Sequence, residues 1–405
     1  MLYTMCQNLS PRYRFFLSLV HSFFFSFVSC TLLACTSSVV TRHEQRVGVI
    51  GVPPRLLGRS PVTLIGRGVR EDDGSWRFGW PNTAIGVRFL GTELDVLMEE
   101  VGPRLMAGQP LHNQFDIWLD GVLLAQRLTL SPQQRRYPLV RQLAAGEHSV
   151  WLRKRTEGLV GSARFVDFVV GGLDAGLLPP PEPAERQIVV IGASNEAGYG
   201  VERSLRAPAT CGFTAETENA NLAWPALLAS SLRAELTNLA ASGKGILRSN
   251  AGSTDAAATL PGMFDRADPL DAKAVWQEVE QGPRLVLIDL GGNDYAQGAP
   301  DQEAFIVAYA GFLRRVQARY PRAEVVCLIS PSILPRLRPR LRQDLQQAIM
   351  RASEPRRRSL DLFEFTYDTG DTFGCDGHPD RVRQLQLARQ VAPLAMRLTG
   401  WVGSL

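Results

Sequence analysis

Two residues far apart in the sequence could act together as a nucleophile and its base. Ser194 lies in the turn Gly-Ala-Ser-Asn-Glu (192–196) directly after an apolar run, where a serine hydroxyl can be exposed. His378 is the only histidine between Ile188 and Leu405. A serine becomes a nucleophile when a base of near-neutral pKa takes its proton, and imidazole is such a base. The pair predicts acyl transfer, although a helix N-cap and a structural histidine explain each residue alone.

Two further loops carry groups that could stabilise a developing negative charge. Gly243 follows an apolar run in Ala-Ala-Ser-Gly-Lys-Gly (240–245), and a residue without Cβ lets backbone N–H groups approach a ligand closely. Asn293 follows the next such run in Asp-Leu-Gly-Gly-Asn-Asp (289–294) and offers a side-chain amide. Ordinary turns would explain either loop alone.

The elements that must position these loops alternate in type. The second half of the chain alternates apolar runs (188–191, 236–240, 285–290 and 325–329) with segments of helical period (222–234, 302–318, 341–352 and 381–398). This alternation predicts an α/β domain over residues 188–402, with a parallel sheet covered on both faces. The carboxyl ends of its strands would bring all four loops to one edge.

The first half of the chain has a different pattern. Short alternating runs recur between turn signals, at residues 63–69, 84–90, 93–98, 114–119, 122–128 and 149–155. An Asp-Gly pair at residues 120–121 is typical of a hairpin turn between two of them. The pattern predicts an all-β jelly-roll sandwich over residues 45–171. Residues 172–187 include three consecutive prolines and predict a semi-rigid linker.

Composition restricts the class of protein. The chain has 405 residues, 45% of them hydrophobic and 21% charged, with a net charge of +4, which excludes disorder for most of its length. Its basic residues are spread along the sequence, so we expect no nucleic-acid partner. Five histidines leave little material for a His-rich metal site. We expect neither a metal nor an organic cofactor, because Ser-His acyl transfer needs none.

The N-terminus predicts export. Arg12 and Arg14 precede an uncharged run from Phe15 to Ala34, which is typical of a signal segment over residues 1–35. The run ends in Leu-Leu-Ala followed by Cys35, which resembles a lipobox with Cys35 as the lipidated residue. An uncleaved membrane anchor and plain secretion are the alternatives. We therefore expect a periplasmic or outer-membrane lipoprotein, or a secreted protein, that meets a membrane only through this terminus.

The four ordered loops resemble those of the SGNH (GDSL-like) hydrolases. This resemblance implies a flavodoxin-like three-layer α/β fold with Ser194 as nucleophile and His378 as base. It also implies that the N–H groups of Ser194 and Gly243 and the amide of Asn293 form the oxyanion hole.

The preceding β domain extends the resemblance. With that domain and the segment Trp-Leu-Arg-Lys-Arg-Thr-Glu-Gly-Leu-Val-Gly (151–161), the chain from about residue 45 to 400 looks like carbohydrate esterase family 2. The family resemblance implies an acetyl xylan esterase-like enzyme that removes O-acetyl groups from an acetylated polysaccharide or oligosaccharide. The alternatives are an esterase for bacterial glycans or small acyl esters, and a non-catalytic carbohydrate-binding lipoprotein.

The sequence departs from the SGNH pattern at two positions. Ala193 stands where the family usually has Asp before the nucleophile, and Cys375 stands where most members have the catalytic Asp, three residues before the histidine. Asp376 is a candidate for the missing acid. A backbone carbonyl that orients His378 in a Ser-His dyad is the interpretation that we prefer.

Other residues have less specific signals. Cys211 and Cys375 lie in loops at the expected active edge, where a disulfide would hold the histidine loop, and two buried thiols are the alternative. Tyr295, Trp76 and Trp80 could stack on sugar rings, whereas core packing would explain them equally.

Overall fold

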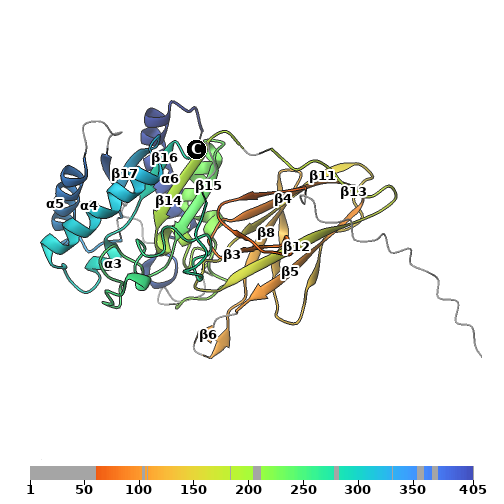
Figure 1. Ribbon diagram of the computed structural model, residues 1–405, viewed down its shortest axis with the longest axis horizontal. Coiled ribbons are helices and arrows are strands. Elements are labelled where there is room, and N and C mark those ends of the chain that lie inside the picture. The colour runs from red at the N-terminus through yellow and green to blue at the C-terminus, as the bar shows by residue number, and fades with distance from the viewer. Residues whose placement is uncertain are drawn as a thin grey trace, which may run out of the picture. The chain divides into compact units, whose positions relative to one another are not determined.

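The computed structural model describes residues 61–102, 105–106, 108–182, 184–203, 211–277, 282–330, 332–353, 360–366 and 373–404. The predicted export signal and Cys35 lie outside these ranges. Residues 56–405 form one compact unit, and the contacts below belong to its described part (Figure 1). No helix in the described ranges is long and apolar enough to cross a membrane.

The first part of this unit is a sandwich of two antiparallel sheets. One sheet has the order β1-β4-β11-β8-β9 with β13 on β4, and its strands are Val62–Ile65, Ala84–Leu90, Glu147–Lys154, Gln114–Leu119, Val122–Thr129 and Gly176–Leu177. The other has the order β10-β5-β12-β3-β2, with strands Arg136–Val140, Glu93–Val101, Ser162–Gly171, Trp76–Phe78 and Val69–Arg70. A two-stranded ribbon pairs β6 (Leu105–Met106) with β7 (Gln109–Pro110).

Alternation of side chains along the strands builds the sandwich core. Val87 and Phe89 of β4 point inward and pack with Val96 of β5 and Phe165 of β12, as expected for strands with one buried face. The predicted all-β domain is confirmed. Part of the predicted linker also belongs to it, because Gly176–Leu177 pairs with β4 as strand β13.

The second part is a parallel sheet of order β15-β14-β16-β17-β18. Its strands are Glu235–Ala240, Gln187–Gly192, Leu285–Ile288, Glu324–Ile329 and Leu360–Glu364. The helices are α1 (Ser194–Ala197), α2 (Trp224–Ser231), α3 (Gly292–Tyr295), α4 (Gln302–Arg319), α5 (Arg338–Ala352) and α6 (Arg381–Thr399). Single 3-10 turns lie at Ala220–Leu222, Ala256–Ala258 and Cys375–Gly377.

Both faces of this sheet are buried. Val189 and Ile191 of β14 point to the side on which α4 and α5 pack, whereas Ile188 and Val190 point to the side on which α2 and α6 pack. Figure 1 shows α4 and α5 side by side. The three-layer α/β arrangement predicted for this region is confirmed.

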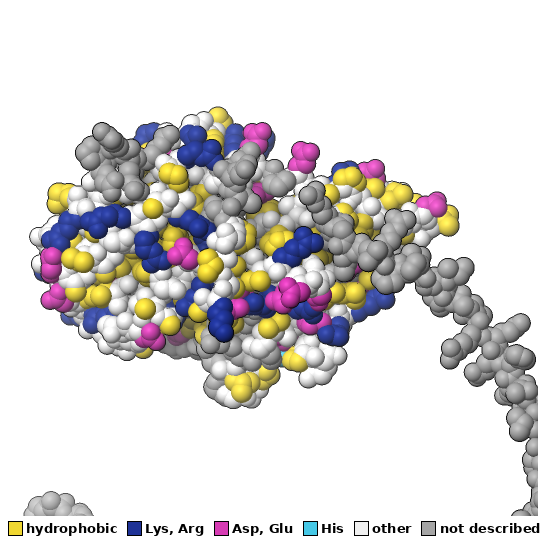
Figure 2. Space-filling model, in the orientation of Figure 1, with side chains coloured by type: hydrophobic (Ala, Val, Ile, Leu, Met, Phe, Trp, Pro, Cys, Tyr) yellow, Lys and Arg dark blue, Asp and Glu magenta, His cyan; other side chains and the backbone are white. Residues whose placement is uncertain are grey.

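Polar contacts join the sandwich to the α/β part. The guanidinium of Arg77 donates to Asp268 and Asp271, each at 2.9 Å, and Ser162 donates to Asp268 at 2.8 Å. Arg67 is buried and donates to the hydroxyl of Tyr320 at 2.8 Å. On the face shown in Figure 2, basic side chains are interspersed with acidic and hydrophobic ones.

Candidate active site

The turn that carries Ser194 is shaped by a buried carboxyl group. Strand β14 ends at Gly192 and helix α1 begins at Ser194. The backbone N–H of Ala193 donates to Oε2 of Glu196 at 2.7 Å, and the indole of Trp224 donates to Oε1 at 2.8 Å. A Cβ on Gly192 would come within 2.3 Å of that carboxyl, so only glycine fits there. The turn therefore holds its shape without the usual family Asp at position 193.

Ser194 and His378 form a direct hydrogen bond. The hydroxyl Oγ of Ser194 lies 2.7 Å from Nε2 of His378. The other ring nitrogen, Nδ1, lies 3.0 Å from the carbonyl oxygen of Cys375. A carbonyl only accepts, so Nδ1 carries the proton and Nε2 is free to accept from the serine. The imidazole thus has the tautomer that a general base needs.

Burial favours the neutral imidazole. Desolvation lowers the pKa of His378 from its usual value, while the Cys375 carbonyl and the Asp376 charge oppose this effect. The histidine is therefore a free base at neutral pH. The adjoining helix α6 is fixed by its N-cap, because Asp380 accepts from the backbone N–H of Arg383 at 3.0 Å.

Asp376 bonds to a tyrosine and not to the histidine. Its Oδ2 accepts from the hydroxyl of Tyr199 at 2.7 Å, and the Tyr199 ring stacks on the His378 ring with centroids 4.1 Å apart and planes 23° apart. The position at Nδ1 is taken by the Cys375 carbonyl. The geometry is that of a Ser-His dyad, so Asp376 does not hold the place of a catalytic acid.

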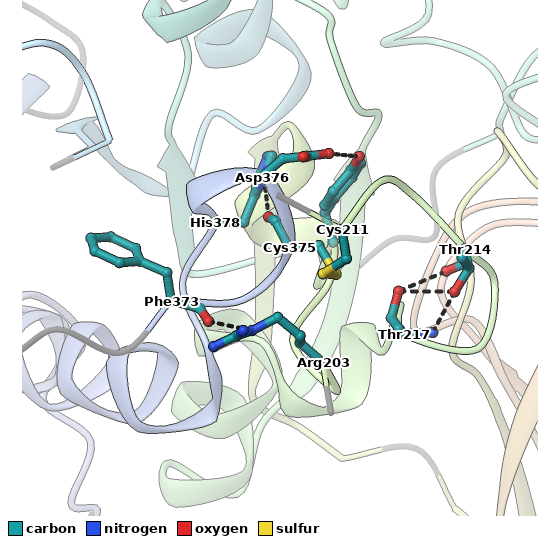
Figure 3. The surroundings of a disulfide bond; sticks show 9 residues. Arg203, Cys211, Thr214, Thr217, Phe373, Cys375, Asp376 and His378 are labelled. Atoms are coloured by element: carbon teal, nitrogen blue, oxygen red, sulfur yellow. Dashed lines mark hydrogen bonds between the residues drawn. A yellow bond between two sulfur atoms is a disulfide. The ribbon is translucent and has the colours of Figure 1, made fainter. Parts of the chain in front are cut away.

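A disulfide anchors the loop that carries the histidine. Cys211 and Cys375 are bonded across 164 residues of sequence, and Figure 3 shows the bridge beside Asp376 and His378. The backbone N–H of Cys375 donates to the carbonyl of Gly200, and Cβ on Gly200 would lie 2.6 Å from that nitrogen. These contacts fix the peptide whose carbonyl accepts from Nδ1.

The predicted oxyanion residues lie in neighbouring loops that bond to each other. Gly243 has a φ of +75°, and its carbonyl accepts from the backbone N–H of Asn250 at 2.9 Å. The side-chain amide of Asn293 donates to the carbonyl of Lys244 at 2.8 Å. That bond uses one of the two amide hydrogens of Asn293 and leaves the other for a ligand.

Ser194, Asn293 and His378 border a cavity of about 490 Å³. Its apolar side comes from Ile333, Leu334 and Leu337, of which Leu334 is half exposed. Sequence reasoning missed these residues, although their loop follows the fourth apolar run of the sheet. Gly243 does not itself border this cavity, but the carbonyl of its neighbour Lys244 accepts from Asn293, which does.

A pair of buried acids lies under the cavity. Asp289 and Glu196 both border it and hydrogen-bond to each other. Burial raises the pKa of both carboxyls, and their mutual repulsion raises that of Asp289 further. Because Glu196 also accepts from Ala193 and Trp224, the pair is a structural element under the nucleophile turn.

Two of the three aromatic residues expected to stack on sugars have buried rings, although Tyr295 borders the cavity. Trp80 is only 1% exposed and donates to the carbonyl of Arg266, and Tyr295 is only 1% exposed and donates to Asp344. The stacking prediction is wrong for both, because a covered ring offers no face. Trp76 is half buried on β3 of the sandwich and does not border the cavity. No group of three or more metal-ligating side chains occurs among the described residues.

Family models match most of the described chain. The carbohydrate esterase 2 N-terminal model matches residues 64–181, and the GDSL-like lipase/acylhydrolase model matches residues 190–382. The α/β domain has a parallel sheet with a Ser-His pair at its edge, and it follows this N-terminal domain. These features define a GDSL-like ester hydrolase. The chain belongs to the SGNH hydrolases and, within them, to carbohydrate esterase family 2.

Curated relatives and solved structures agree with this assignment. The cellulase/esterase CelE of Acetivibrio thermocellus is 28% identical over 335 residues, which are 82% of this chain and 39% of CelE. The chain thus spans well under half of that relative. An acetylxylan esterase / glucomannan deacetylase of Cellvibrio japonicus is 25% identical over 352 residues, covering 84% of this chain and 89% of that protein. A family two carbohydrate esterase structure from Clostridium thermocellum in complex with cellohexaose is 25% identical with a TM-score of 0.76, covering 84% of this chain and 100% of that one.

Proposed function

We propose that this chain is a serine esterase that removes O-acetyl groups from polysaccharides of the xylan or glucomannan type. The observation that carries the proposal is the 2.7 Å contact between Ser194 Oγ and His378 Nε2 at the edge of the cavity. The Cellvibrio relative, whose length the chain nearly spans, is named an acetylxylan esterase / glucomannan deacetylase, which supports this substrate class.

The reaction would proceed through an acyl-enzyme. Ser194 Oγ attacks the acetyl carbonyl while Nε2 of His378 takes the hydroxyl proton. The resulting oxyanion accepts from the N–H groups of Ser194 and Gly243 and from the free amide hydrogen of Asn293. His378 then gives its proton to the sugar oxygen as the alcohol leaves. Water, deprotonated by the same histidine, hydrolyses the acetyl-serine and restores the hydroxyl.

The imidazolium formed in each step would be stabilised mainly by the dipole of a carbonyl bonded to Nδ1, with a smaller contribution from the charge of Asp376. The Cys375 carbonyl accepts from Nδ1 throughout the cycle. The disulfide keeps this carbonyl in place, because its partner Cys211 lies on a separate segment of the chain. The dyad therefore depends on backbone position more than on any single acidic side chain.

Acetate release tests the substrate class. Wild-type protein is incubated with acetylated xylan, acetylated glucomannan, O-acetylated peptidoglycan and a small acetyl ester, with the Ser194→Ala variant as control. The proposal predicts the highest kcat/KM on one of the two plant polysaccharides. Preference for peptidoglycan or for the small ester would replace it with an alternative substrate, and binding of xylan without acetate release would indicate a non-catalytic carbohydrate-binding protein.

We propose that the protein is exported and held at a membrane by a lipid on Cys35. The charged start, the uncharged run over residues 15–34 and the Leu-Leu-Ala-Cys sequence support this. Cys35→Ala should move the protein from the membrane fraction to the soluble fraction. Membrane association that survives this change would indicate an uncleaved anchor, and a wild-type protein found only in the medium would indicate plain secretion.

A further inference from the structure

A carboxyl group of the sandwich domain reaches the oxyanion loop. Glu157 lies between strands β11 and β12, in a domain that contains neither Ser194 nor His378. Its Oε2 accepts from the backbone N–H of Ser242 at 2.7 Å. Ser242 immediately precedes Gly243, the expected backbone donor to the oxyanion. The two domains therefore meet at the peptide before Gly243, in the loop whose Lys244 carbonyl accepts from the cavity residue Asn293.

The carboxyl of Glu157 is held by a second buried acid. Glu218 accepts from the backbone N–H of Glu157 at 3.0 Å through Oε2, and the two side chains hydrogen-bond to each other. Both residues are buried, and neither Oε1 atom has another donor among the described residues. Burial raises the pKa of both carboxyls. A hydrogen bond between two carboxyl groups requires a proton on one of them, and that proton would satisfy an otherwise unpartnered Oε1 atom.

A buried lysine balances the remaining charge. The ammonium of Lys154 is fully buried and donates to the carbonyl of Thr156 at 2.6 Å and to that of Glu157 at 3.4 Å. Burial lowers the pKa of Lys154 to about 8, so most of it is charged at pH 7. One ammonium and one shared negative charge make the cluster neutral, which reduces the cost of burying it.

The oxyanion loop, which contains Ser242, Gly243 and Lys244, requires contacts from outside itself to fix its conformation. Gly243 has a positive φ and no Cβ, so its own side chain cannot restrain the direction of its N–H. The loop is tied after this point by Asn293 to the Lys244 carbonyl and by Asn250 to the Gly243 carbonyl. Glu157 ties it before this point, at Ser242.

We propose that Glu157, with its proton-sharing partner Glu218, is a positioning residue by which the sandwich domain aims the Gly243 N–H at the oxyanion. The inference rests on the proposed esterase function. It gives the N-terminal domain a part in the reaction without contact with the substrate. An oxyanion donor acts mainly in the transition state, so its misplacement lowers kcat more than it raises KM.

Three variants separate this role from simple domain packing. Glu157→Met removes the acceptor for Ser242 at similar length, and should lower kcat about 10- to 100-fold with KM changed less than about threefold, a smaller loss than removal of a donor. Glu157→Gln keeps an acceptor for Ser242 and gives an amide N–H to Glu218, and should keep kcat within about threefold of wild type. Glu157→Gln combined with Glu218→Gln opposes two amide groups and should behave like the Met variant.

Arg77→Met is the matched control. It breaks the contacts with Asp268 and Asp271 between the same two domains, away from the loop. It should lower the melting temperature and leave kcat unchanged. If Glu157→Met does not fold, the single and double Gln variants carry the test.

The outcomes distinguish failure of this inference from failure of the proposed function. Loss of acetate release in Ser194→Ala tests the function itself. The rate of Ser194 labelling by a fluorophosphonate, whose phosphoryl oxygen takes the oxyanion position, tests the loop with no sugar substrate. Folded Glu157→Met with wild-type kcat and labelling rate overturns the inference. A Glu157→Gln variant as impaired as Glu157→Met also overturns it, as does a fully active double Gln variant.

Discussion

Replacing Asp376 with Asn distinguishes a dyad from a triad. In the structure the carboxyl of Asp376 accepts from Tyr199, and the Cys375 carbonyl accepts from Nδ1 of His378. The asparagine oxygen can accept from the same tyrosine, so the loop should keep its shape. What the change removes is one negative charge near the imidazole.

The structure sets the size of the expected effect. Asp376 is exposed, and a pair of unit charges 4 Å apart in water interacts by about 1 kcal/mol. Loss of that interaction lowers kcat by about fivefold, and we expect a loss within about tenfold. An acid that truly accepted from Nδ1 would cost as much as about 10⁴-fold, the loss known from serine proteases.

The pH profile provides a second measurement on the same variant. Desolvation lowers the pKa of His378, and the Asp376 charge opposes this. Removing that charge disfavours the imidazolium, so the acid limb of kcat/KM should move to lower pH. Tyr199→Phe is the matched control, because it keeps the ring stack and removes the hydroxyl that binds Asp376. A loss of more than about a hundredfold in a variant with unchanged circular dichroism would refute the dyad.

Two further predictions concern the oxyanion hole and the disulfide. Asn293→Ala should lower kcat by about 10²- to 10³-fold in steady-state kinetics, with little change in the melting temperature measured by thermal unfolding. A change in KM alone would mean that Asn293 only binds substrate. Replacing Cys211 and Cys375 together with Ala should destabilise the fold by about 4 kcal/mol in denaturant unfolding, because the bridge closes a long loop. The same variant should also have a lower kcat, because the disulfide no longer holds the Cys375 carbonyl in place. A stable double variant with wild-type kcat would show that the other contacts of the loop hold the histidine.

The chemistry at the sheet edge could be predicted because parallel strands end together. Apolar runs alternating with helical segments placed four loops at one edge, and the Ser194 and His378 loops do meet there in direct contact. The preceding all-β domain was predictable from its alternating strands. These features follow from patterns of a few residues each, which local sequence contains.

The residues whose roles the sequence did not predict correctly have one physical feature in common. Trp80 and Tyr295 lie near turns in sequence, but tertiary packing buries their rings, and a single sequence does not reveal burial of an aromatic residue. Tyr199 stacks on the imidazole from five residues after the nucleophile, a spacing without a known signature. Glu157 meets Ser242 across a domain boundary, 85 residues apart. Such contacts depend on how elements pack and not on local pattern.

In the proposed acyl-enzyme mechanism, Ser194 carries the acetyl group during turnover. Protein turning over an acetyl ester is quenched in acid, digested and examined by mass spectrometry, with Ser194→Ala measured in parallel. We expect an acetylated peptide containing Ser194 in the wild type, and a kcat at least about 10³-fold lower in a folded Ser194→Ala variant. Acetate release that persists in Ser194→Ala at a rate near that of the wild type would contradict this mechanism.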